Sequence, residues 1–234
     1  MNRPLVAIDG PAGAGKSTVT QRVADELGYL LVDTGALYRA VALAAQRAGI
    51  AWDDDEPLGA LAYQLVKEHA VELGSQKSNG FAVKLRGEDV SSAIRKPDVS
   101  QGASKVSAVP AVREALLDMQ RQAGAAGGAV LEGRDIGTVV FPKADAKFFL
   151  TASVDVRARR RYDELVSRGA RPDLAEVQRE VAERDLRDST RPIAPLKPAS
   201  DALIIDSSSL SIEQVVARIV SRVREVEAEL GAGA

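Results

Sequence analysis

The chain of 234 residues contains no cysteine and a single histidine, His69. The absence of cysteine excludes disulfides, thiolate metal ligands and cysteine nucleophiles, and one histidine cannot form a histidine-cluster metal site. Aromatic residues make up only 4% of the chain, and no run of about 18 apolar residues is present. The opening MNRPLVAIDG has too short an apolar run for a signal peptide. We therefore expect a cytoplasmic protein without a membrane partner.

Charge of either sign is not in excess. The chain has 31 Lys+Arg against 33 Asp+Glu, a formal net charge of −2, so the basic excess of a general nucleic-acid binder is missing. Hydrophobic residues make up 45% and charged residues 27%, as in an ordinary globular protein. The length accommodates one α/β core with a small appended subdomain, and a monomer is the simplest expectation.

Short apolar runs alternate with helical patterns along most of the chain. The expected strands are LVAID (5–9), YLLVD (29–33), GAVL (128–131), KFFL (147–150) and DALIID (201–206). Amphipathic patterns predict helices over 16–28, over 34–49 and after a capping box of Ser211 and Gln214. This alternation predicts an α/β fold with a five-stranded parallel sheet and helices on both of its faces.

Two segments depart from that alternation. Residues 71–94 read as a small β meander with a turn at Ser78-Asn79-Gly80. Residues 154–191 read as helical and hold ten arginines, nine acidic residues and no lysine. Within them ERDLRDSTR (183–191) places Arg184, Arg187, Asp188 and Arg191 on one helical stripe, which continues the apolar Val177 and Val181. Such a stripe is either a solvated face with ion pairs or a helix that leaves the core to meet an anion.

A complete phosphate-binding motif follows the first expected strand. GPAGAGKS (10–17) matches G-x-x-x-x-G-K-[ST] between a strand and a helix start, and this placement disfavours a chance glycine turn. Backbone N–H groups and the helix N-terminus would surround a polyphosphate, Lys16 would reach the β- and γ-phosphates, and Ser17 would ligate Mg²⁺. The predicted ATP-binding residues of this loop are Gly10, Pro11, Ala12, Gly13, Ala14, Gly15, Lys16, Ser17 and Thr18.

The class of P-loop protein can be narrowed. The chain's only asparagines, Asn2 and Asn79, do not form the N-K-x-D motif of GTPases, and the length leaves no room for the further domains of most motor ATPases. We therefore expect a small-molecule kinase. The alternatives are a P-loop kinase for another nucleotide or a sugar acid, and a nucleotide-binding protein without transfer activity.

Further motifs carry a family resemblance. They are DTGALYR (33–39), ASKVSAVPAVREAL (103–116), EGRDIGTVVFP (132–142), ERDLRDSTRPIAPL (183–196) and ADALIIDSSSLSIEQV near the end. With the P-loop, they make the chain similar to bacterial-type cytidylate kinases from about residue 4 to 222. The resemblance implies phosphate transfer from ATP to CMP or dCMP with Mg²⁺. It also implies one P-loop kinase domain over 1–234, with a core of about 1–33, 105–152 and 192–234, a nucleoside-monophosphate-binding insert of about 34–104, and a lid of about 153–191.

Site residues follow from the resemblance, position by position. Arg39, Arg134 and Arg191 match arginines that grip the acceptor phosphate. The predicted CMP site also includes Ser104, Arg113 and Asp135 for cytosine, Arg184 and Asp188 for the ribose, and Thr34 and Tyr38 along the pocket. Arg157 and Arg161 of the lid are predicted to contact ATP ahead of Arg159 and Arg160. Lys16, Arg134, Arg191 and Arg157 are the predicted catalytic residues, and Ser17 the predicted Mg²⁺ ligand.

Several of these assignments have a structural alternative. Asp135 can accept the exocyclic N4–H₂ of cytosine, which uracil lacks, or it can pair with Arg134 or Arg113. Ser104 can be a solvated or capping serine, Tyr38 can be a packing residue, and each lid arginine can be solvated. Glu132 stands where the family most often has Asp, which leaves open whether it orients Mg²⁺ waters, and Thr34 stands where many relatives have Ser.

Overall fold

The computed structural model describes residues 3–77 and 80–232. By their contacts the residues form two compact units, one of Met1–Val32 and Ala126–Ala234, the other of Asp33–Ala125. Among the described residues, no helix is both long enough and apolar enough to cross a bilayer.

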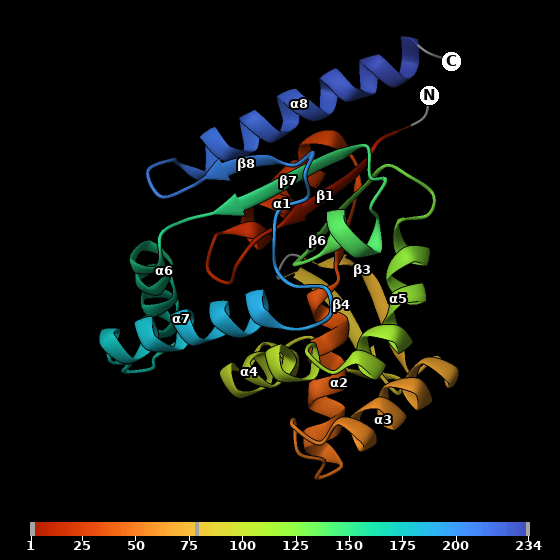
Figure 1. Ribbon diagram of the computed structural model, residues 1–234, viewed down its shortest axis with the longest axis vertical. Helices are drawn as coiled ribbons and strands as arrows, with labels where there is room; N and C mark the ends of the chain where they lie inside the picture. Colours follow the sequence, from red (N-terminus) through yellow and green to blue (C-terminus); the bar gives the residue numbers. More distant parts are fainter. Residues whose placement is uncertain (1–2, 78–79, 233–234) are drawn as a thin grey trace. The chain divides into compact units, whose positions relative to one another are not determined.

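A five-stranded sheet forms the centre of the larger unit, as predicted (Figure 1). Its strand order is β2-β6-β1-β7-β8, and β1 pairs in parallel with both β6 and β7, as does β7 with β8. The strands are β1 (Leu5–Asp9), β2 (Leu30–Asp33), β6 (Ala129–Gly133), β7 (Ala146–Thr151) and β8 (Leu203–Asp206). Val6, Ala7 and Ile8 of β1 are fully buried, as expected for a central parallel strand covered on both faces.

Two helices of this unit pack against each other along the sheet. They are α1 (Lys16–Leu27), which contacts β6 and β1, and α8 (Ile212–Ala232), which contacts β7. The capping box predicted before α8 is present: Ser211 N–H donates to Gln214 Oε1 at 2.9 Å, and Gln214 N–H donates to Ser211 Oγ at 3.2 Å.

The arginine-rich segment folds as a pair of packed helices, α6 (Val154–Ser167) and α7 (Leu174–Thr190). Ala158 of α6 and Val177 and Val181 of α7 form their buried contact. The apolar part of the predicted α7 stripe is therefore the face that holds the pair together, and its continuation carries the arginines of residues 183–191.

The smaller unit combines helices with a separate sheet. Its helices are α2 (Gly35–Arg47), α3 (Asp55–Lys67), the short 3₁₀ turn η1 (Ala93–Arg95), α4 (Pro97–Val106) and α5 (Pro110–Gly124). The predicted meander is an antiparallel sheet of β3 (Val71–Lys77), β4 (Gly80–Leu85) and β5 (Glu88–Asp89). Ser78 and Asn79 of the predicted turn lie outside the described residues.

Candidate functional site

The phosphate-binding loop lies between β1 and α1, where its motif predicted it. Gly10 has φ +148°, and a Cβ there would lie 1.9 Å from the carbonyl oxygen of Leu150 in β7. Gly13 has φ +76°, and a Cβ there would lie 3.0 Å from Cβ of Arg157. Both positions therefore require glycine, for backbone conformation and for space. The loop ends at Gly15, so α1 begins without a side-chain cap and its first N–H groups remain for a ligand.

Lys16 is the buried cation of the loop, with 4% of its surface exposed. Its Nζ donates to the carbonyl oxygens of Gly10 at 2.7 Å and Pro11 at 2.8 Å. Burial lowers the pKa of Lys16 to about 7, helped by the positive charges of Arg134 and Arg184 and opposed by Glu132 and Asp9. A polyphosphate beside Lys16 would restore the charged ammonium, so the site is electrostatically prepared for an anion.

Ser17 and Glu132 are joined by a hydrogen bond. The Ser17 hydroxyl donates to Glu132 Oε1 at 2.9 Å, and Thr20 donates to Glu132 Oε2 at 3.2 Å. A hydroxyl and a carboxylate are the hard oxygen donors that Mg²⁺ prefers. No cluster of three or more His, Cys, Asp or Glu suited to a metal occurs in the described part of the chain. The donor set therefore fits an ion held mainly by phosphates and water, as Mg²⁺ usually is.

Asp9, at the end of β1, anchors the loop after β6. It is 4% exposed, and its two carboxylate oxygens accept the backbone N–H groups of Ile136 and Gly137, both at 2.8 Å. Burial raises the pKa of Asp9 to about 6 against the opposing effect of these hydrogen bonds. The anchored turn, Ile136–Val140, is a single π-helical turn immediately after Arg134 and Asp135. Asp9 therefore fixes the backbone that presents two predicted site residues.

Four predicted site residues of the larger unit form two ion pairs. Arg134 Nε lies 3.3 Å from Asp188 Oδ2, and Arg191 Nη2 lies 3.3 Å from Asp135 Oδ1. Asp188, Asp135 and Arg191 are each less than a tenth exposed. Asp135 therefore has an ion pair with Arg191, a residue that the sequence did not indicate as its partner beside Arg134 and Arg113. Arg184 lies on α7 with its Nε 3.9 Å from Asp188 Oδ2.

The arginines of α6 differ in what they contact. Arg157 is 4% exposed and donates from Nη1 to Ala12 O of the P-loop at 3.1 Å and to Asp185 Oδ1 of α7 at 2.9 Å. Arg160 donates from Nη1 to Ala14 O at 3.3 Å and from Nη2 to Ser207 O at 2.8 Å. Arg161, predicted ahead of Arg160, instead pairs with Glu164 of its own helix at 2.8 Å.

Two further predicted residues lie at the start of the smaller unit, near the end of β2. Arg39 pairs through Nη2 with Asp33, while its Nε is buried and has no hydrogen-bond partner among the described residues. A buried donor without an acceptor is costly, and an anion would satisfy it. Thr34 is the N-cap residue of α2, 2% exposed, and makes no side-chain capping bond.

The remaining predicted residues of this unit are buried. Ser104 of α4 is 3% exposed, and Tyr38 of α2 and Arg113 of α5 are each 7% exposed. The Arg113 guanidinium carbon lies 5.6 Å from the centroid of the Tyr38 ring, a cation–π contact, and its Nη1 donates to Ser107 O at 3.3 Å. Tyr38 therefore packs within this unit, and its predicted place along the CMP pocket stays a prediction.

Asp9, Arg160 and Asp185 were not among the sequence-predicted site residues. Asp9 directly precedes the P-loop, and this position in the sequence could have identified it as a site residue. Asp185 stands among several equivalent charges on α7, so only its pairing with Arg157 distinguishes it.

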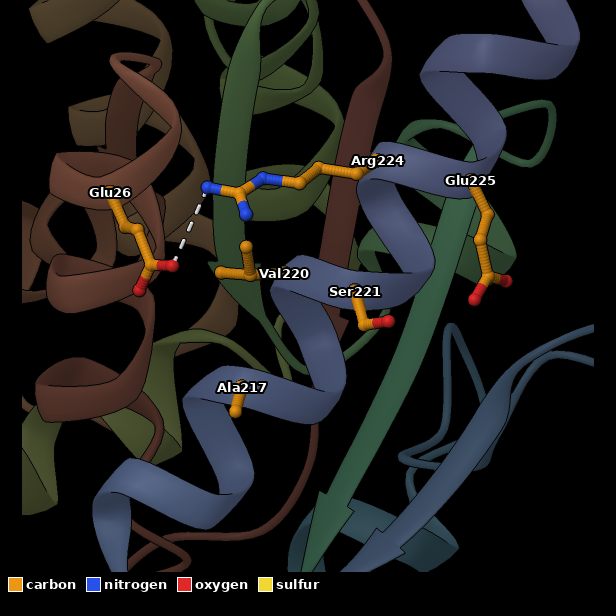
Figure 2. A pocket seen from close by; sticks show the side chains of 6 residues that line it. All are labelled: Glu26, Ala217, Val220, Ser221, Arg224 and Glu225. Carbon is orange, nitrogen blue, oxygen red and sulfur yellow. Dashed lines mark ion pairs between the residues drawn. The ribbon is translucent and has the colours of Figure 1, made fainter.

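A hollow beside α8 involves none of the predicted residues (Figure 2). Arg224 reaches across Val220 toward Glu26 of α1, with 3.6 Å between Nη2 and Oε1. Both charged side chains are about half exposed, so the pair is a surface ion pair of small energetic weight. The hollow is lined by Glu26, Ala217, Val220, Ser221, Arg224 and Glu225.

Comparisons with known proteins identify the family of the chain. The cytidylate kinase family model matches residues 6–225. A cytidylate kinase of Geobacter sulfurreducens is 54% identical over 95% of this chain and 94% of the relative. Those of Syntrophotalea carbinolica and Pelotomaculum thermopropionicum are 51% and 52% identical, over 96% and 94% of this chain and 94% and 96% of the relatives. The chain therefore belongs to the cytidylate kinase family.

Proposed function

We propose that the protein transfers the γ-phosphoryl group of ATP to CMP and dCMP, with Mg²⁺ as cofactor. The observation that carries the proposal is the P-loop, whose buried Lys16 has a pKa lowered to about 7 in the same unit as Arg134 and Arg191. Donor-side and acceptor-side cations within one unit are what a phosphotransferase requires. A catalytically silent nucleotide-binding protein would need the first set alone.

The proposed reaction is a direct in-line transfer. The nucleophile is an oxygen of the CMP phosphate, which is ionised at neutral pH, so a general base is not required. Lys16 and the arginines would stabilise negative charge on the transferring group and hold the two phosphates in line. Arg157 would contribute from the lid, a proposed segment of residues 153–191, since its guanidinium is already hydrogen-bonded to the P-loop backbone at Ala12.

Mg²⁺ would be held by the Ser17 hydroxyl and, through water, by Glu132. When bound it would supply charge neutralisation at the β- and γ-phosphates. The hydrogen bond between Ser17 and Glu132 supports this assignment, since it orients the hydroxyl oxygen. Thr20 holds the second carboxylate oxygen, so the longer Glu side chain is fixed at both of its oxygens.

On the acceptor side we assign the phosphate to Arg39, Arg134 and Arg191, and the ribose to Arg184 and Asp188. We assign the cytosine to Ser104, Arg113 and Asp135, with Thr34 and Tyr38 along the pocket. The buried, unpartnered Nε of Arg39 supports a phosphate contact there. A carboxylate such as Asp135 accepts from the cytosine N4–H₂ group, which uracil does not have.

A coupled assay of ATP consumption tests the proposal. The chain would be offered CMP, dCMP, UMP, AMP, GMP and shikimate at equal concentration, with and without Mg²⁺. We expect strong turnover with CMP and dCMP only, and loss of turnover when Mg²⁺ is chelated. Equal turnover with UMP would remove the cytosine assignment, and turnover with shikimate or AMP alone would favour another small-molecule kinase. No turnover with any acceptor would favour the silent nucleotide-binding protein.

A further inference from the structure

Three buried side chains of the smaller unit form a connected cluster. Gln120 and Arg113 both lie on α5, seven residues apart and therefore on the same face of the helix. Between them they contact Tyr38 of α2. Gln120 Nε2 donates to Tyr38 Oη at 3.3 Å, and the Arg113 guanidinium lies over the Tyr38 ring. The tyrosine is thus held at its hydroxyl by one residue of α5 and covered on its face by another.

The choice of glutamine at position 120 is not explained by packing. Gln120 is 2% exposed, and among the described residues it is the only polar side chain in the group of largest fully buried ones. A buried amide is costly unless it is hydrogen-bonded, and an apolar residue of the same shape would serve the core equally well. The amide Nε2 donates to Tyr38 Oη and to Leu116 O, both at 3.3 Å. The contact that reaches beyond its own helix is the one to Tyr38.

Holding Tyr38 in place also holds Arg113. The Arg113 guanidinium carbon lies 5.6 Å from the centroid of the Tyr38 ring, so the position of the ring limits the directions that the guanidinium can take. Arg113 Nη1 additionally donates to Ser107 O at 3.3 Å, which fixes one corner of that plane. A displacement of the Tyr38 ring would therefore change the direction of the Arg113 guanidinium and its N–H groups.

The direction of these N–H groups decides which base is preferred. A guanidinium has five N–H donors and no acceptor. Cytosine presents acceptors at N3 and O2, whereas uracil presents an N–H donor at N3 and would place donor against donor. A correctly aimed guanidinium therefore favours cytosine, and a guanidinium free to swing can turn to the O4 acceptor of uracil instead.

We propose that Gln120 is a specificity-determining positioning residue: through Tyr38 it fixes the Arg113 guanidinium in the direction that selects cytosine over uracil. The proposal rests on the assignment of CMP as acceptor and adds a residue that does not itself contact the base. If Gln120 were purely structural, its loss would change the stability of the protein without changing the preference for cytosine over uracil.

The test is Gln120→Met, which keeps the length and shape of the side chain and removes its hydrogen bonds. The ratio of kcat/KM for CMP to that for UMP should fall by about tenfold, the effect of one hydrogen bond of ordinary strength. The fall should come through KM for CMP, with kcat little changed, because the phosphate groups are untouched. Gln122→Met, on the exposed side of the same helix, is the matched control and should leave the ratio unchanged.

A double-mutant cycle with Tyr38→Phe tests the route. If Gln120 acts through the tyrosine hydroxyl, Gln120→Met should have no further effect on the CMP/UMP ratio in the Tyr38→Phe background. An unchanged ratio in Gln120→Met, or additive effects in the double variant, would overturn the inference. Should Gln120→Met not fold, Tyr38→Phe alone removes the same hydrogen bond, and an unchanged ratio there overturns it as well. A wild-type chain without CMP activity would overturn the proposed function and this inference together.

Discussion

The P-loop of the larger unit and the Gln120–Tyr38–Arg113 cluster of the smaller unit are built in opposite ways. The P-loop is one contiguous segment whose glycines and backbone set the geometry, with Lys16 held by two carbonyl oxygens of the same segment. The cluster joins two helices, and each of its members is positioned by a neighbouring side chain. Phosphate can be bound by charge and backbone, whereas a base must be recognised by the direction of its hydrogen bonds. The first can be encoded in eight consecutive residues and the second only in packing.

Lys16→Ala should have the largest effect. We expect phosphoryl transfer to fall by about 10³-fold or more, because a cation that neutralises the transferring phosphate is lost. CMP binding should remain, since the cluster of the smaller unit is untouched. Transfer by steady-state kinetics and CMP affinity by calorimetry check the two halves. Retained turnover would refute the proposed mechanism.

Gly102→Ala tests the packing of the smaller unit. A Cβ at Gly102 in α4 would lie 2.5 Å from the Trp52 ring, whose indole N–H donates to Ala42 O at 2.9 Å. We expect the free energy of unfolding to fall by about 1–3 kcal/mol, the usual cost of overpacking. Trp52 is the single tryptophan, so urea unfolding followed by fluorescence reports on this unit directly.

Gly231→Ala is the control for Gly102→Ala, since no atom lies within 4 Å of the Cβ it would add. Its urea midpoint should match the wild type. Unchanged ATP affinity in Gly102→Ala would show that ATP binding at the P-loop does not depend on the packing of the smaller unit. An unfolding midpoint in Gly102→Ala equal to that of the control would contradict the steric account.

Asp185→Asn probes the ion pair between Asp185 and Arg157. Asp185 faces Arg157 with both carboxylate oxygens, and Arg157 also donates to the P-loop at Ala12. Without the charged pair Arg157 is held less firmly, by its bonds to Ala152 O and Ala12 O, and KM for ATP should rise by about tenfold with KM for CMP little changed. Asp163→Asn, which removes an exposed ion pair with Arg159, should leave both constants unchanged. Equal changes in both variants would show that Asp185 has no special role.

Proton uptake on ATP binding is the smallest expected effect. The pKa of Lys16 lies at about 7 in the free protein, so at pH 8 the amine is mostly neutral. Bound phosphates raise this pKa again, and the site should take up close to one proton at pH 8. At pH 6 Lys16 is already charged, and uptake by this group should vanish. Calorimetry in two buffers of different ionisation enthalpy measures the difference, and equal uptake at both pH values would be inconsistent with a lowered pKa.

Features encoded in contiguous segments, like the P-loop, could be predicted from the sequence. The parallel sheet, the meander and the α8 capping box each depend on local patterns of apolar residues, turns or caps, and each is present. The P-loop was recognisable because glycine spacing and a preceding strand suffice to define it. The family itself followed from several collinear motifs.

Ion pairs between side chains that are distant in the sequence could not be predicted from such local patterns. On α7 Asp185 and Asp188 are the same residue type, and only the folded chain shows that Asp185 pairs with Arg157 and Asp188 with Arg134. The i,i+4 spacing of Arg157 and Arg161 favoured Arg161 for ATP contact, and this stays a prediction. The spacing did not indicate that Arg160 donates to the P-loop or that Arg161 pairs with Glu164. A helix face has a width of several residues, and periodicity alone does not determine which of them reaches a neighbour.

The arginines assigned to phosphate each have a carboxylate partner already. The pairs are Arg39 with Asp33, Arg134 with Asp188, Arg191 with Asp135, and Arg157 with Asp185. Apart from Arg39, whose Nε has no partner among the described residues, a lone inorganic phosphate must exchange one existing ion pair for each arginine that it gains, so it gains little. A nucleotide must break the same ion pairs, but the contacts of its base and sugar add binding free energy that offsets this cost. We therefore expect abundant small anions to be poor inhibitors, because the empty protein competes with them by means of its own aspartates.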